Sequence, residues 1–122
     1  TDGAPVAAGP YAQGVRAGGF VFCAGQLPID PASGTVPAGV AEQTRQSLDN
    51  VAAVLKAGGA SMNSAVKTTV FLKNMDDFAA MNAVYAGYFG EGQAPARSTV
   101  EVARLPRDVL VEVEAIALVE TP

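Results

Sequence analysis

The strict alternation of side chains over residues 109–119 constrains the fold more than any other feature of the sequence. One side of this segment is apolar throughout and consists of Val109, Val111, Val113, Ala115, Ala117 and Val119. The other side carries Leu110, Glu112, Glu114, Ile116 and Leu118. Successive side chains of a strand point to opposite faces, so the pattern predicts a β-strand whose apolar face packs under helices.

Two segments are predicted to be helices, residues 40–57 and residues 74–90. The first has one apolar stripe at helical spacing, formed by Val40, Thr44, Leu48, Val51 and Leu55, and a pair of glycines follows it. The second begins at Asn74, a residue suited to cap a helix, with two aspartates in its first turn, and stops at Gly90. Glycine after the last apolar position is a common C-terminal signal, and anions favour the N-terminal turn.

Four further segments are predicted to be strands, namely residues 12–16, 20–26, 64–73 and the stretch that follows Pro95. Val66, Thr68, Val70 and Leu72 are expected on one face of the third of these. Gly25 inside a strand indicates a bulge or a close approach of the backbone. The order is two strands, a helix, a strand, a helix and two strands, which predicts one α+β domain over residues 1–122 with a mixed sheet.

Two helices can cover only one face of such a sheet. The other face would leave apolar side chains uncovered, namely Phe20, Phe22, Phe71, Leu110, Ile116 and Leu118. An apolar face of this size on a single chain implies a partner surface, and association with further copies is the commonest solution. We therefore expect a homo-oligomer whose sheets pack face to face.

The strand after Pro95 places Arg97 and Thr99 on its less apolar side. A guanidinium is a rigid fork suited to a carboxylate, and its ordinary role would be an ion pair with a neighbouring glutamate. If the last two strands formed a simple hairpin, Glu101 would face Glu112, which is unfavourable. A register shifted by two residues puts Arg97 opposite Glu114 and gathers Arg97, Thr99 and Glu112, and we expect that register.

Composition excludes several classes of chemistry. The chain has 122 residues, a formal net charge of −4, no histidine and one cysteine, Cys23. These counts exclude Ser-His and Cys-His nucleophile pairs, imidazole ligands and thiolate clusters, so we expect no metal and no cofactor. The basic residues are scattered along the sequence, which argues against a surface that binds nucleic acid. No apolar run approaches membrane-spanning length and no signal-peptide pattern opens the chain, so cytoplasmic location without membrane attachment is expected.

Six short segments, in this order, resemble the RidA family, also called YjgF. They are GPY at 9–11, GQLP at 25–28, QSLDNV at 46–51, VKTTVF at 66–71, PARS at 95–98 and EVEA at 112–115. The resemblance implies a chorismate-mutase-like α+β fold and a homotrimer with three clefts between subunits. It also implies a 2-iminobutanoate/2-iminopropanoate deaminase, which hydrolyses the reactive enamine and imine products of pyridoxal-phosphate dehydratases to 2-keto acids and ammonia.

The resemblance also assigns roles by position. Arg97 matches the arginine that grips the substrate carboxylate, and Glu112 the acid that handles the attacking water. Tyr11 matches a cleft tyrosine contributed across the interface, Asn82 a cleft-side asparagine, and Gly25 a glycine whose backbone approaches the ligand. Without the resemblance, Tyr11 would fill a turn, Asn82 would be a surface or capping residue, and Gly25 would be only a bulge.

Two substrate-binding positions depart from the family pattern. Thr99 stands where many members have cysteine, and Ala24 where many have serine. A threonine hydroxyl can still bond substrate or water, whereas Ala24 removes one polar contact, so we expect altered substrate preference. Two alternative functions stay open, namely an endoribonuclease or translation inhibitor of the L-PSP type and a non-catalytic trimer that binds small molecules in the same cleft.

Overall fold

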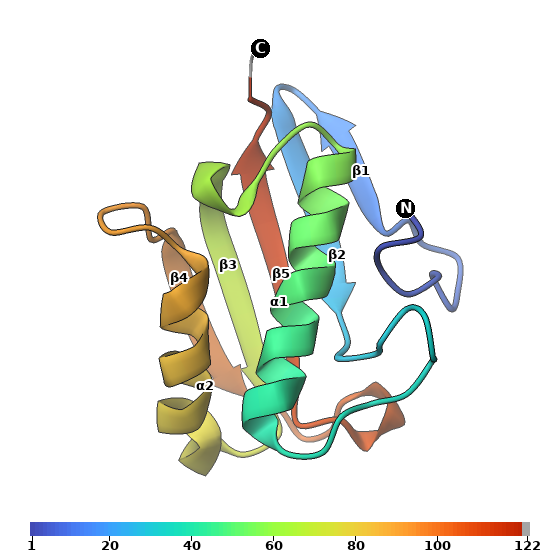
Figure 1. Cartoon of the computed structure of the whole chain (residues 1–122), viewed down its shortest axis with the longest axis vertical. Coiled ribbons are helices and arrows are strands. Elements are labelled where there is room, and N and C mark those ends of the chain that lie inside the picture. The colour runs from blue at the N-terminus through green and yellow to red at the C-terminus, as the bar shows by residue number, and fades with distance from the viewer. Residues whose placement is uncertain (121–122) are drawn as a thin grey trace.

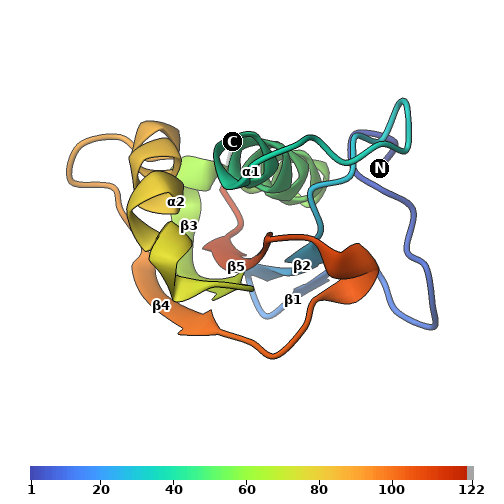
Figure 2. The same cartoon turned by 90° about the horizontal axis from the view of Figure 1, so that it is seen from below.

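A five-stranded sheet with the strand order β1-β2-β5-β3-β4 is covered on one face by two helices (Figures 1 and 2). The computed structural model describes residues 1–120. In chain order the elements are β1 (Gly14–Ala17), β2 (Phe20–Gln26), α1 (Val40–Ala57), β3 (Ala65–Leu72), α2 (Phe78–Tyr85), β4 (Ala96–Glu101) and β5 (Val111–Leu118). The predicted order of elements, the mixed sheet and the α+β class are therefore confirmed.

Helix α1 occupies the predicted residues and lies across the middle of the sheet (Figure 1). Thr44, Leu48, Val51 and Leu55 of its predicted stripe are fully buried. At its C-terminal end the N–H of Gly58 donates to the carbonyls of Val54 and Leu55, at 3.2 and 3.1 Å. Gly59 follows with φ of +88°, a conformation that glycine adopts without strain.

Strand β5 lies at the centre of the sheet between β2 and β3, and it is antiparallel to both. Val111, Val113, Ala115 and Ala117 are buried beneath the helices, as the alternation predicts. The pairing of β2 with β5 is interrupted between Cys23 and Gln26, which confirms a bulge around Gly25. On β3 a similar irregularity lies between Ala65 and Lys67, and Val66 is 40% exposed, so the prediction that it shares the face of Thr68, Val70 and Leu72, which are buried, is wrong.

The predicted hairpin of the last two strands is wrong, because β4 and β5 are not neighbours. Strand β3 lies between them, parallel to β4 and antiparallel to β5. The connection over residues 102–110 crosses the end of β3, where the N–H of Val102 donates to Leu72 and the N–H of Lys73 donates to Leu110, at 2.8 and 3.0 Å. Because β3 separates the two strands, Leu72 pairs with Glu101 and Phe71 with Glu112, and the contact of the two glutamates that a direct hairpin would create is avoided.

Strand β4 is an edge strand, and the face on which Arg97 lies differs from the prediction. The Cα partner of Arg97 is Thr68 and that of Thr99 is Val70, and both partners are buried beneath the helices. Paired residues of neighbouring strands share a face, so Arg97 and Thr99 point toward α2. Figure 2 shows β4 lying beneath α2 at this edge.

The other face of the sheet is uncovered, as predicted, and we call it the open face. Its most exposed apolar side chains are Val15, Phe22, Val100 and Leu118, each more than 40% exposed. Phe22 pairs with Ile116 and Phe20 with Leu118, so the apolar surface continues across β2 and β5. None of the helices within residues 1–120 is both long and apolar enough to span a bilayer.

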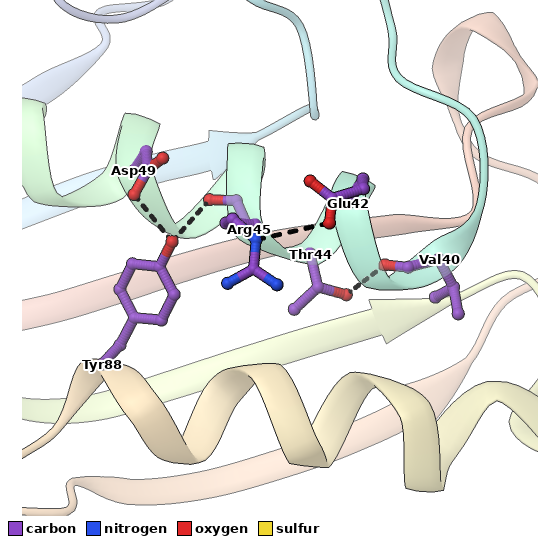
Figure 3. A network of polar contacts seen from close by, with 6 residues as sticks. All are labelled: Val40, Glu42, Thr44, Arg45, Asp49 and Tyr88. Carbon is purple, nitrogen blue, oxygen red and sulfur yellow. Dashed lines mark hydrogen bonds and ion pairs between the residues drawn. The ribbon is translucent and has the colours of Figure 1, made fainter.

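Helix α2 is shorter than predicted. The Asn74 side chain accepts a hydrogen bond from the N–H of Asp76 at 2.9 Å, but it caps a 3₁₀ turn that precedes the helix. The α-helix ends at Tyr85, and a second 3₁₀ turn carries the chain to Tyr88. The hydroxyl of Tyr88 donates to Asp49 Oδ1 at 2.7 Å and contacts the carbonyl of Arg45 at 3.1 Å, which ties this end of α2 to α1 (Figure 3).

Candidate functional site

Arg97 lies over two aromatic rings of α2. Its guanidinium carbon is 4.6 Å from the centre of the Tyr85 ring and 5.5 Å from the centre of the Phe78 ring. A guanidinium above an aromatic face is attracted by the ring's electron density. The arginine is thus held by its flat face while it keeps its positive charge.

No carboxylate within residues 1–120 neutralises Arg97. The ion pairs in this part of the chain are Arg45 with Glu42 and Arg104 with Asp108. Glu114, the expected partner, lies on the open face beside Thr69, so the predicted pairing with Arg97 is wrong. A partly enclosed guanidinium without a carboxylate is available to bind an anionic ligand.

Two further predicted residues accompany Arg97. The Thr99 hydroxyl is buried and has no hydrogen-bond partner within the described chain, which leaves it available to a ligand or a water. Asn82 is partly buried and lies four residues after Phe78 and three before Tyr85, which places it on the same side of α2. We call Arg97, Thr99, Asn82, Phe78 and Tyr85 the arginine group.

Glu112 belongs to the open face, because Val111 and Val113 on either side of it point into the core. Its carboxylate occupies the space beside Gly25, since a Cβ at position 25 would overlap Glu112 Oε2. Burial raises the pKa of Glu112, and the charge of Glu114 raises it further. A carboxyl group with a raised pKa is better suited to proton transfer near neutral pH.

Tyr11 lies close to Gly25. Both residues line a small hollow of about 40 Å³ between the N-terminal segment and the end of β2. The Tyr11 side chain is 53% exposed, and its hydroxyl oxygen accepts a hydrogen bond from the N–H of Ala8 at 3.2 Å. We call Glu112, Gly25 and Tyr11 the glutamate group.

Ala24 lines a larger hollow of about 310 Å³ on the open face, together with Phe22, Cys23, Lys67 and Glu114. Cys23 is buried, and burial followed by the charge of Glu114 raises its pKa to about 12. Its thiol is therefore protonated at neutral pH and unsuited to nucleophilic chemistry. The described residues 1–120 hold no cluster of His, Cys, Asp or Glu that could bind a metal ion.

The two groups lie apart within one chain. Arg97 points toward the helices from the edge strand β4, whereas Glu112 points to the open face from the central strand β5, with β3 between them. The prediction that one register gathers Arg97, Thr99 and Glu112 is therefore wrong for a single chain. Arg97 and Thr99 do lie together.

Sequence reasoning missed the contact of Arg97 with α2. Tyr85 is buried, whereas Phe78 is 37% exposed. The signal was present in their spacing, because Phe78, Asn82 and Tyr85 fall on one helix side at the period of an α-helix.

Comparison with protein families identifies the chain over almost its full length. The model of the family described as Endoribonuclease L-PSP matches residues 1–119. The chain is 56% identical over 121 residues to a RutC family protein of Pyrococcus horikoshii, covering 98% of this chain and 95% of that protein. It is 55% identical over 120 residues to the 2-iminobutanoate/2-iminopropanoate deaminase of Escherichia coli K12, covering 97% and 94% of the two chains.

Solved structures show the same fold. The YjgF gene product of E. coli superposes with a TM-score of 0.92 at 51% identity, covering 98% of this chain and 96% of that chain. E. coli TdcF, solved with bound serine, gives a TM-score of 0.92 at 51% identity, with coverages of 97% and 94%.

Proposed function

Since the chain belongs to the Endoribonuclease L-PSP family, which includes the RidA proteins, we propose that it is a 2-iminobutanoate/2-iminopropanoate deaminase. It would hydrolyse reactive 2-imino acids and their enamine forms to 2-keto acids and ammonia. The relatives named for this activity share more than half of their residues with this chain over nearly its whole length.

The observation that carries the proposal is that the Arg97 guanidinium is free to bind an anion. It is a partly enclosed cation whose N–H groups have no carboxylate partner within residues 1–120. A 2-imino acid offers the carboxylate that such a fork binds with two parallel hydrogen bonds. The serine bound to the related TdcF has the same arrangement, a carboxylate next to a carbon that bears nitrogen.

The position of Glu112 favours a site completed by a second copy. A small imino acid held by Arg97 in one chain cannot reach the Glu112 of that chain, which lies on the other face beyond β3. The open face, with Phe22, Val100 and Leu118 exposed, is a suitable surface for association. We therefore propose a homotrimer in which each cleft takes the arginine group from one copy and the glutamate group from its neighbour.

The reaction in such a cleft needs one water molecule. The water oxygen adds to the imine carbon, a proton moves to the nitrogen, and a carbinolamine forms. The C–N bond then breaks, ammonia leaves, and the hydroxyl oxygen becomes the keto oxygen after it loses its proton. Glu112 would take a proton from the water and return one to the departing nitrogen. Holding the carboxylate and the water in position supplies the rest of the rate enhancement.

The remaining predicted residues would shape the cleft. The buried Thr99 hydroxyl would bond substrate or water, because it has no partner in the described chain. The Tyr11 hydroxyl, which accepts one hydrogen bond from Ala8, still has a proton to donate. Asn82 would contact the substrate from α2, and Ala24 and Gly25 would approach it through their backbone. The single buried thiol fits a reducing compartment, so we propose a cytoplasmic enzyme.

Hydrolysis of freshly generated 2-iminopropanoate tests the proposed reaction directly. The imine is produced in the cuvette by a dehydratase, and its disappearance is compared with and without this protein. We expect clear acceleration over the rate in buffer, at a protein concentration below that of the dehydratase. Hydrolysis at the buffer rate by folded protein would refute the deaminase assignment and favour a binding protein.

A mixing experiment tests the shared site. Arg97→Ala and Glu112→Gln chains, each expected to be inactive, are refolded together in equal amounts. Random trimers should recover about a quarter of wild-type activity, because one cleft in four combines both intact groups. As a control, wild type mixed with the double variant should also show about a quarter, whereas a site within one chain would give about half. A monomer at micromolar concentration in sedimentation equilibrium would contradict the trimer.

A further inference from the structure

We propose that Tyr85 and Phe78 are positioning residues that hold the Arg97 fork open for a carboxylate. This inference rests on the proposed function, because it assigns to Arg97 an anionic substrate. We call the two rings the aromatic cradle. Tyr85 forms its floor at 4.6 Å from the guanidinium carbon, and Phe78 forms its outer side at 5.5 Å.

Two contacts hold the Tyr85 side chain in place, one at its hydroxyl and one at its ring. Its hydroxyl forms a buried hydrogen bond of 2.6 Å with the hydroxyl of Thr68, the residue paired in register with Arg97 on the neighbouring strand. Its ring packs against Phe89 with centroids 4.8 Å apart and planes inclined by 45°. Thr68, Tyr85 and Arg97 thus form one connected unit, so the position of the guanidinium is determined by the strand pairing and by α2.

A ring holds an arginine differently from a carboxylate. A carboxylate bonds to the N–H edge of the guanidinium and neutralises it, whereas a ring contacts the flat face and leaves the five N–H donors free. The carboxylate on the same side of β4, that of Glu101, accepts a hydrogen bond from the N–H of Met75 at 2.8 Å. The cradle therefore restricts the motion of Arg97 without occupying the donors that a substrate needs.

Phe78 lies at the solvent side of the cradle and not within the core. Phe78 is 37% exposed at the start of α2, so it contributes less to the core than the buried Tyr85. At the other end of this segment the Tyr88 hydroxyl donates to Asp49 of α1 (Figure 3), which holds the segment against that helix.

The test uses four variants of the full chain and two readouts that do not depend on turnover. Tyr85→Leu removes the floor, Tyr85→Phe keeps the ring but removes the bond to Thr68, and Phe78→Leu removes the outer side. Phe89→Leu is the matched control for Phe78→Leu, because it makes the same change in a ring that packs on Tyr85, whereas the rings facing the Arg97 guanidinium are those of Tyr85 and Phe78. The readouts are the NMR signal of the Arg97 Nε–H group and the dissociation constant of 2-oxobutanoate, a stable 2-keto acid.

We expect the Arg97 Nε–H proton of wild type to be shifted upfield by the Tyr85 ring and to lose that shift in Tyr85→Leu. The same variant should bind 2-oxobutanoate about 5- to 30-fold more weakly, and Phe78→Leu about 2- to 5-fold more weakly. Tyr85→Phe should stay within about threefold of wild type although its melting temperature falls, and Phe89→Leu within about twofold.

The outcomes separate the cradle from the proposed reaction. If affinity follows melting temperature, so that Tyr85→Phe or Phe89→Leu loses as much as Tyr85→Leu, the rings are only structural and the cradle is refuted. Absence of the upfield shift in wild type, or of 2-oxobutanoate binding by wild type, would also refute it. If both readouts behave as expected but wild type does not hydrolyse the imine, the cradle stands and the deaminase assignment fails.

Discussion

Gly25 on β2 leaves open the space that the carboxylate of Glu112 on β5 occupies, since a Cβ at position 25 would overlap Glu112 Oε2. The bulge between Cys23 and Gln26 brings the Gly25 backbone to that carboxylate. The absence of a side chain at position 25 therefore determines where the proposed acid–base group lies.

Gly25→Ala should displace the Glu112 carboxylate and lower kcat by about 10- to 100-fold, because misplacing a reacting group by about 1 Å has effects of that size. The matched control is Gly87→Ala, where an added Cβ would meet nothing within 4 Å. The control should keep wild-type kcat and stability within about 1 kcal/mol. Equal kcat values for the two variants in imine hydrolysis would show that the contact has no role in turnover.

The pH dependence of kcat/KM should report the protonation of the Glu112 carboxylate. A base acts when it is deprotonated, so activity should be present above its pKa and fall as the pH decreases through it. Burial and then the charge of Glu114 raise the pKa of Glu112, which moves this loss to higher pH than for an ordinary glutamate. Glu114→Gln should therefore move the fall of kcat/KM on the acid side of the profile, its acid limb, to lower pH.

Glu112→Gln in the same titration should remove the acid limb and lower kcat by about 10²- to 10⁴-fold. If Glu114→Gln leaves the limb where it is, or moves it upward, the assignment of that limb to Glu112 is wrong. Each protein should be compared at pH values where its melting temperature is unchanged.

The fold was largely predictable from the sequence because its elements have strong local patterns. Helix α1 was predicted over about the residues it occupies, from one apolar stripe and two following glycines. The alternation over β5 predicted which of its side chains are buried. The two faces of the sheet, one covered and one open, followed from counting two helices against five strands.

The sequence did not determine which strands are neighbours in the sheet. Pairing of β4 with β3 is a long-range choice, and local alternation carries no information about it. The error propagated to the site, because the false hairpin placed Arg97 beside Glu114 and Glu112, which lie on the other face. The irregularity in the pairing at Val66 was missed for the same reason, since it depends on the register with β5.

Alkylation should leave the enzyme active, because Cys23 is the only thiol and is buried under the sheet with its pKa raised to about 12. Less than about one thiol in ten thousand is then ionised at pH 7.5, and the thiolate is the reactive form. We expect no loss of imine hydrolysis after an hour with iodoacetamide, and complete labelling once the chain is unfolded in guanidinium. Rapid inactivation of folded protein with one equivalent of label would contradict this picture.

Replacement of Arg97 should separate a carboxylate clamp from a stabilising role. Arg97 has no carboxylate partner within residues 1–120, so Arg97→Lys and Arg97→Ala should lose only the contacts with the Tyr85 and Phe78 rings. We expect losses of stability of about 0.5–2 kcal/mol. By contrast, kcat/KM should fall about 30- to 1000-fold in Arg97→Lys, because an ammonium cannot form the bidentate pair, and at least as much in Arg97→Ala.

Melting temperature and imine hydrolysis should be measured on the same preparations of wild type and both variants, with Arg104→Lys as the control. Arg104 is an exposed arginine that pairs with Asp108 in the connection between β4 and β5 and belongs to neither proposed group, so its replacement should change kcat/KM less than about twofold. Hydrolysis by folded Arg97→Ala at a rate close to that of wild type would show that the carboxylate is held elsewhere, and both the clamp and the cradle that supports it would then be abandoned.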